Sequence, residues 1–115
     1  PIGADEVALA DEVAALRAEL MAALGEGTRA AFDLRVKNAR RAFARTVLAE
    51  WLEQALRVDA VVREAAAARE TRNAARRARR VADAEAAIAA ALAEVPDLEL
   101  WRVLVSLREE LRAAK

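Results

Sequence analysis

Polar side chains continue an apolar helical stripe in the middle of this chain, and they are the residues with chemistry to offer. At four-residue spacing, Thr46, Glu50 and Gln54 extend the line of a stripe that ends at Phe43. A carboxylate or an amide on a core line is costly unless it has a partner, because burial removes it from water. The pattern therefore predicts either a polar site inside the fold or a helix that turns this line towards solvent.

A second apolar line leads into arginine. The stripe that contains Ala65 and Ala68 continues as Arg72 and Arg76. A bidentate, charge-assisted contact between Glu50 and Arg72 would satisfy both groups and leave them able to orient a polar ligand. We therefore expect these two side chains to meet in the interior.

Aromatic residues could supply flat walls for such a site, because small-molecule pockets are mostly apolar with few polar groups. We expect an interior pocket for an aromatic, drug-like small molecule. The predicted ligand-binding residues are Thr46, Glu50, Gln54, Arg72, Phe43, Trp51 and Trp101. In the alternative, Glu50 and Gln54 reach solvent and the alanines permit close helix packing. Trp51 and Trp101 would then be packing residues.

Several kinds of chemistry are excluded by composition. Cysteine, histidine and tyrosine are absent, so there can be no disulfide, no thiolate nucleophile and no Ser-His-Asp device. The commonest general base and zinc ligand is also missing. The acidic residues show no calcium-loop spacing, and there is no glycine-rich phosphate loop. We therefore expect no catalysis, no cofactor and no metal site.

Net charge is zero, but the charges are segregated along the chain. Residues 1–27 carry six acids and one Arg, and residues 28–45 carry six bases and one Asp. Residues 60–82 carry seven Arg and two Glu, and residues 83–111 carry seven acids and two Arg. The pattern predicts acidic and basic helices that neutralise each other and select their neighbours. A basic face for nucleic acid or for an acidic protein is the alternative.

The overall charge balance argues against nucleic acid, whose binding typically needs a basic excess. The uncharged apolar runs are too short to span a membrane, and the acidic N-terminus does not resemble a signal peptide. We expect a soluble monomer whose partner is the small molecule. The run Arg76, Arg77, Arg79 and Arg80 is expected at a solvated helix end, where cations favour the C-terminal dipole.

The elements that must position these residues are helices. Hydrophobic residues make up 57% of the chain, with three Gly and two Pro, and Ala, Leu, Arg and Glu are strong helix formers. No strand-like alternation occurs. The sequence predicts an all-α fold, a compact bundle of four to five helices with short loops, forming a single domain over residues 1–115.

Helix boundaries are predicted from capping residues. The expected helices cover residues 4–24, 29–57, 59–80 and 83–95, with a last helix after the firm break at Pro96–Asp97. Gly25 should end the first helix and Thr28 should begin the second. Asp59 and Asp83 are the expected N-caps of the third and fourth helices. One continuous helix over residues 59–95 is the alternative.

In style, the chain resembles de novo designed helical bundles. Its near-maximal helix propensity, minimal loops and lack of Cys and His fit that class, as do phrases such as Asp83-Ala84-Glu85-Ala86-Ala87. The resemblance covers the whole chain but has no motif, and a natural Ala/Arg-rich helical protein from a GC-rich bacterium is the alternative. Because the sequence begins with Pro1 rather than Met, we expect it to have been cut from a longer polypeptide.

The resemblance implies a chosen purpose and no inherited activity. The pocket described above is the first hypothesis. The second is a structure-only fold with no ligand, which predicts a filled interior and an exposed Glu50. The third is a module that binds another protein, through the arginine face of its second and third helices or an exposed apolar patch.

Overall fold

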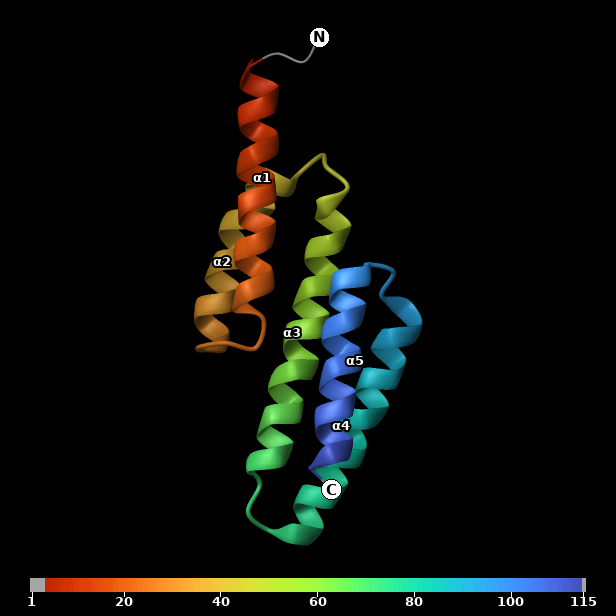
Figure 1. Cartoon of the computed structure of the whole chain (residues 1–115). Coiled ribbons are helices and arrows are strands. Elements are labelled where there is room, and N and C mark those ends of the chain that lie inside the picture. Colours follow the sequence, from red (N-terminus) through yellow and green to blue (C-terminus); the bar gives the residue numbers. More distant parts are fainter. Residues whose placement is uncertain (1–3, 115) are drawn as a thin grey trace. The chain divides into compact units, whose positions relative to one another are not determined.

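The computed structural model describes the backbone of residues 4–114 and the side chains of residues 10–114, so Pro1 lies outside it. Five helices occupy most of this range (Figure 1). They are α1 (Ala4–Ala23), α2 (Arg29–Phe43), α3 (Leu48–Glu70), α4 (Ala74–Glu94) and α5 (Leu98–Ala113). No strand occurs between residues 4 and 114, so the predicted all-α class and number of helices are confirmed.

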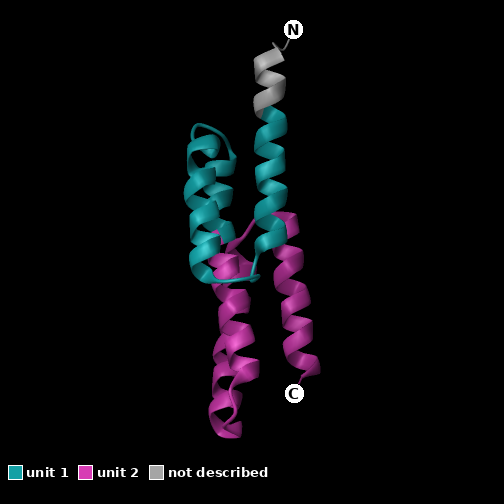
Figure 2. Ribbon diagram, turned by 90° about the vertical axis from the view of Figure 1, so that its left-hand side faces the viewer, with its two compact units in different colours: residues 1–55 teal, residues 56–115 magenta. Residues whose placement is uncertain are grey.

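The helices gather into two compact units, unit 1 with residues 1–55 and unit 2 with residues 56–115 (Figure 2). The boundary falls inside α3, so roughly its first two turns belong to unit 1 and the rest to unit 2. The single domain over residues 1–115 that the sequence predicted stays a prediction, and each unit is described by itself. Each unit has its own set of buried apolar side chains.

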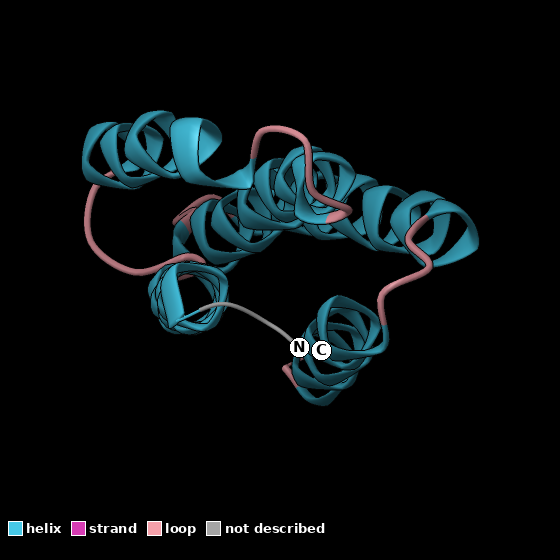
Figure 3. Ribbon diagram, turned by 90° about the horizontal axis from the view of Figure 1, so that it is seen from above, coloured by secondary structure: helices cyan, strands magenta, loops and turns pink. Residues whose placement is uncertain are grey.

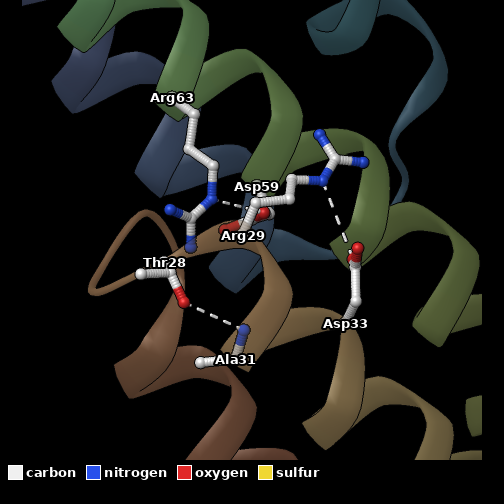
Figure 4. A network of polar contacts seen from close by, with 6 residues as sticks. All are labelled: Thr28, Arg29, Ala31, Asp33, Asp59 and Arg63. Carbon is white, nitrogen blue, oxygen red and sulfur yellow. Dashed lines mark hydrogen bonds and ion pairs between the residues drawn. The ribbon is translucent and has the colours of Figure 1, made fainter.

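In unit 1, α1 and α2 form a hairpin closed by the turn that the sequence predicted. Gly25 and Gly27 have φ angles of +72° and +61°, a region in which a residue with a Cβ is strained. Thr28 begins α2, because its side-chain oxygen accepts a hydrogen bond from the Ala31 amide at 3.1 Å (Figure 4). The buried apolar residues of the hairpin are Leu20, Leu24, Phe32, Val36, Ala39 and Phe43.

The single helix predicted over residues 29–57 is wrong, because the chain breaks between Phe43 and Leu48. Arg45 takes a φ of +66°, and the Thr46 hydroxyl donates to the Phe43 carbonyl at 2.7 Å and accepts from the Leu48 amide at 3.1 Å. Neither Gly nor Pro marks this turn, so the sequence carried no standard break signal.

The predicted breaks at Asp59 and at Asp83 are also wrong, since both residues lie inside helices. Asp59 is a fully buried residue of α3, and the Arg63 Nε lies 2.9 Å from its Oδ2, one helical turn away (Figure 4). The break falls between α3 and α4, where the Asn73 side chain accepts a hydrogen bond from the Arg76 amide at 2.9 Å. One continuous helix over residues 59–95 is therefore excluded as well.

Unit 2 contains the rest of α3 together with α4 and α5. Helices α4 and α5 pack on each other. The loop between α4 and α5 is short (Figure 3), and Asp97 begins α5 by accepting a hydrogen bond from the Leu100 amide at 2.9 Å. The predicted break at Pro96–Asp97 is thus confirmed. Buried residues of the two helices are Ala84, Ile88 and Ala91 on α4 and Leu100, Leu104, Leu107 and Leu111 on α5. No helix in the described range has the length and apolar character to cross a membrane.

Opposite charges link helices within each unit, as the segregated charges predicted. In unit 1, Arg35 of α2 pairs with Glu19 of α1. In unit 2, the Nη1 of Arg69 on α3 lies 3.5 Å from the Oε2 of Glu110 on α5. All four side chains are more than one-third exposed. Because water screens such pairs, each contributes at most about 1 kcal/mol to stability.

Candidate functional site

The predicted meeting of Glu50 and Arg72 does not occur. Glu50 lies in the first turn of α3 and belongs to unit 1, whereas Arg72 lies in the loop after Glu70, the last residue of α3, and belongs to unit 2. Both side chains are exposed. The prediction that they face the interior is wrong. The break after Phe43 interrupts the helical line that was extended to Glu50, and α3 ends at Glu70, before the line that was extended to Arg72 reaches it.

Glu50 and Thr46 have local roles that account for their positions. A carboxylate in the first turn of a helix interacts favourably with the positive end of the helix dipole, and Glu50 is the acid in the first turn of α3. Thr46 is half-buried because its hydroxyl bonds to the backbone on both sides of the α2–α3 turn. Gln54 is also half-buried. The positions of Glu50 and Thr46 therefore need no ligand to explain them.

Two of the predicted aromatic residues meet, but as packing partners. The rings of Phe43 and Trp51 lie edge to face, with centroids 6.2 Å apart, and both side chains are buried. The guanidinium carbon of Arg17 lies 5.0 Å from the centre of the Trp51 ring, within cation–π range. Trp101 belongs to unit 2 and is 41% exposed. Phe43 and Trp51 thus fill space inside unit 1.

Unit 2 has a cleft of about 600 Å³, which we call the arginine cleft. It lies where the C-terminal ends of α3 and α5 meet the N-terminal half of α4. Its lining residues are Arg69, Ala74, Arg77, Ala78, Val81, Leu111 and Ala114. The four lining residues of α4 are spaced by three or four along the helix, so they share one face. The walls are alkyl groups, and two guanidinium groups add positive charge.

Arg77 is held in place by the end of α3. Its Nη1 donates to the Thr71 carbonyl at 3.2 Å and to the Arg72 carbonyl at 3.4 Å. Carbonyls at a helix C-terminus lack partners within the helix, and a cation there also interacts favourably with the dipole. Only one of its terminal nitrogens makes a hydrogen bond in the described structure, so other N–H donors remain available at the cleft.

The arginine run was expected at the C-terminal end of its own helix, and this expectation is wrong. Arg76 and Arg77 lie in the first turns of α4, where the helix dipole disfavours cations. Arg77 and Arg80 instead contact the end of α3, since the Arg80 Nη1 donates to the Thr71 hydroxyl at 2.9 Å. The sequence could not show this, because it placed the helix break ten residues too late along the chain.

Arg69 supplies the second charge of the arginine cleft. Its partner in the described structure is Glu110, at 3.5 Å, and the two side chains are 38% and 59% exposed. A guanidinium has five N–H donors in a planar fork that suits carboxylate, sulfonate or phosphate oxygens. With alkyl walls beside two such groups, the cleft is suited to hold an anion that carries an apolar body.

Two smaller cavities lie along the α1–α2 hairpin of unit 1. They measure about 350 and 370 Å³, and the ion pair between Arg35 and Glu19 borders both. The smaller cavity is lined by Glu19, Glu26 and Arg35, and the other by Glu19 and Arg35, so neither has a net positive charge to select an anion. No group of three or more residues able to hold a metal ion occurs in the part of the chain that the structure describes.

Comparison with family models, curated proteins and solved structures gives no match to this chain. The function must therefore be argued from the chemistry of the site. The resemblance to designed helical bundles stays a prediction.

Proposed function

We propose that this chain is a non-catalytic binding protein that holds an anionic small molecule with an aromatic or other apolar body in the arginine cleft. The proposal keeps the class of ligand expected from the sequence but moves the site from Glu50 and Trp51 to unit 2. The observation that carries it is the presence of Arg69 and Arg77 together in one alkyl-walled cleft of drug-like size. The lack of Cys, His and Tyr supports a binding role over catalysis.

The dimensions of the cleft fit such a ligand. Small-molecule sites usually span about 300–1,000 Å³ and are mostly apolar, with a few polar groups that set orientation. In the arginine cleft, Val81 and Leu111 offer apolar contact, while the two guanidiniums offer charge-assisted hydrogen bonds. The anionic group of the ligand would lie at the arginines and its apolar body along α4 and α5.

Affinity should be moderate, because the charged groups are partly exposed to water. Drug-sized ligands gain about 0.3 kcal/mol per non-hydrogen atom. A probe with about 20 such atoms would thus gain roughly 6 kcal/mol, which corresponds to a Kd of some tens of micromolar. Tight binding is not needed for the proposal, but saturable binding at one site is.

A matched pair of probes tests the apolar part of the site. 1-Anilinonaphthalene-8-sulfonate carries the anion, and N-phenyl-1-naphthylamine has the same rings without it. Ala78→Phe places a ring in the cleft, while Ala86→Phe places one on another face of α4, at an exposed position. In fluorescence titrations, Ala78→Phe should weaken both probes at least tenfold, and Ala86→Phe should leave them within about twofold.

Charge recognition is tested with Arg69→Gln and Arg77→Gln against Arg79→Gln. Arg79 is exposed and lies on the opposite side of α4 from the cleft. The first two changes should weaken the sulfonate probe several-fold and leave the neutral probe unchanged. Equal binding of the sulfonate by wild type and Ala78→Phe would sink the proposal. It would then favour a fold without a ligand, as the exposed Glu50 also does.

Binding of an acidic protein segment is the second candidate. Arg76 and Arg79 are exposed and form no ion pair within the described residues. They occupy the N-terminal half of α4, whose first turn has no acid, so an anionic partner would relieve unfavourable charge–dipole interactions. Exposed pairs contribute little, which places this candidate second. A glutamate-rich peptide that binds wild type and Ala78→Phe equally, but not Arg76→Gln/Arg79→Gln, would favour it.

A further inference from the structure

Glu110 stands beside the arginine cleft in a position to compete with a ligand. Its Oε2 lies 3.5 Å from the Nη1 of Arg69, which lines the cleft, and Glu110 itself belongs to α5 next to the lining residue Leu111. A charge-assisted N–H···O bond is normally about 2.7–2.9 Å long. The contact is therefore long for its kind, and both groups are well exposed to water.

The local sequence gives Glu110 no second cation on its own helix. Side chains meet on a helix at spacings of three and four, and those positions around Glu110 are Ser106, Leu107, Ala113 and Ala114. Its contact with Arg69 is accordingly the ion pair that the described structure shows for it. Glu109, the adjacent residue, is exposed and makes no ion pair within the described residues. Glu109 can therefore serve as a control for Glu110, because it is an adjacent glutamate that does not contact Arg69.

We infer that Glu110 is an intramolecular competitor for Arg69, which an anionic ligand must displace when it enters the arginine cleft. This inference rests on the proposed function. When the cleft is empty, the carboxylate occupies part of the donor fork of Arg69. When the ligand binds, its anionic oxygens take those donors and the Glu110 side chain turns to water. Glu110 thereby selects for ligands whose anionic group competes well with a carboxylate, and it does not affect uncharged ligands.

For specificity, this means that only anionic ligands lose binding free energy by displacing Glu110 from Arg69. Removing the Glu110 charge should strengthen anion binding by the free energy of an exposed ion pair, which corresponds to about two- to fivefold in Kd. Binding of a neutral molecule should not change, because it does not use Arg69. High salt should shrink the difference, since it screens the exposed pair.

The test compares Glu110→Gln with Glu109→Gln in titrations with 1-anilinonaphthalene-8-sulfonate and N-phenyl-1-naphthylamine. We expect Glu110→Gln to bind the sulfonate two- to fivefold more tightly than Glu109→Gln does, with equal affinities for the neutral probe. The double variant Arg69→Gln/Glu110→Gln should bind the sulfonate as Arg69→Gln does. Equal sulfonate affinities in the two single variants would overturn the inference.

The two proposals can fail separately. If Ala78→Phe blocks the sulfonate but Glu110→Gln and Glu109→Gln bind it alike, the cleft is the site and Glu110 is not a competitor. If the wild type does not bind the sulfonate saturably, or if Ala78→Phe does not weaken that binding, the proposed function itself is wrong. A tighter affinity of Glu110→Gln for the neutral probe as well would also contradict competition, because it would indicate a change in the shape of the cleft.

Discussion

The Arg80 guanidinium donates a hydrogen bond of 2.9 Å to the Thr71 hydroxyl, which itself donates to the Ala67 carbonyl at 2.9 Å. This relay connects the last turn of α3 to the second turn of α4. It ends α3 through side chains from the next helix, in a loop that has neither glycine nor proline. The same loop holds Arg77 at the arginine cleft, so the helix end and the candidate site depend on each other.

Replacing Thr71 should therefore cost stability. Thr71→Val keeps the shape of the side chain but removes the donor to Ala67 and the acceptor for Arg80. We expect the free energy of unfolding to fall by about 1 kcal/mol, the usual contribution of such hydrogen bonds. Urea unfolding followed by circular dichroism measures the change. Thr71→Ser retains the hydroxyl and should lose less than half as much, and equal losses in both variants would contradict the relay.

Asp59 should be among the least replaceable side chains of unit 2. It is completely buried, and its partner Arg63 is 18% exposed. Asp59→Ala leaves a mostly buried guanidinium without this carboxylate, and we expect a loss of about 3 kcal/mol in the free energy of unfolding. Thermal or urea unfolding measures it.

Two further variants separate the charge from the packing at Asp59. Asp59→Asn can still accept a hydrogen bond from the Arg63 Nε, so it should lose clearly less than Asp59→Ala. Asp59→Leu/Arg63→Met replaces the pair with apolar groups and should also be more stable than Asp59→Ala, since no buried charge remains. If Asp59→Ala stays within 1 kcal/mol of wild type, the ion pair has no role in stability.

Arg45 is the position where a glycine should help. With a φ of +66°, it pays the cost of a left-handed conformation for a residue with a Cβ, about 1 kcal/mol. Glycine avoids that cost but gains freedom in the unfolded chain, so Arg45→Gly should raise the free energy of unfolding by about 0.5 kcal/mol. Arg45→Ala keeps the Cβ and should be less stable than Arg45→Gly by about 0.5 kcal/mol.

A helix interior provides the control for Arg45, because alanine should be more stable than glycine there, the reverse of the order expected at position 45. Ala82 is an exposed residue in the middle of α4, and Ala82→Gly should lower the free energy of unfolding by about 1 kcal/mol. The same denaturation assay serves for all three variants. A finding that Arg45→Ala is more stable than Arg45→Gly would contradict the left-handed conformation at this position.

Signals that depend on neighbouring residues were predicted correctly from the sequence. The turn with Gly25 and the cap at Thr28 were found, as was the break at Pro96–Asp97. In each case the physical cause is local: a positive φ, a hydroxyl that reaches the next turn, or a missing amide hydrogen. Composition alone was enough for the all-α class.

The candidate site was missed because its parts become neighbours only through packing. The predicted residues around Glu50 relied on one helix running past Phe43, and the break at Arg45 and Thr46 removed that basis. Arg69 lies on α3 and Arg77 lies on α4, and a loop separates the two helices in the chain. No spacing rule for a single helix could have paired them.

The sequence by itself determined that this chain forms helices, where its strongest caps lie, and which catalytic devices it lacks. These follow from backbone preferences and from the inventory of side chains, which act over a few residues. Only the tertiary structure decided that Asp59 is buried inside a helix, that α3 ends at Glu70, next to Arg80's partner Thr71, and that Arg69, Arg77 and Leu111 line one cleft. Those outcomes depend on contacts between helices, whose free energies outweigh weak local preferences at ambiguous positions.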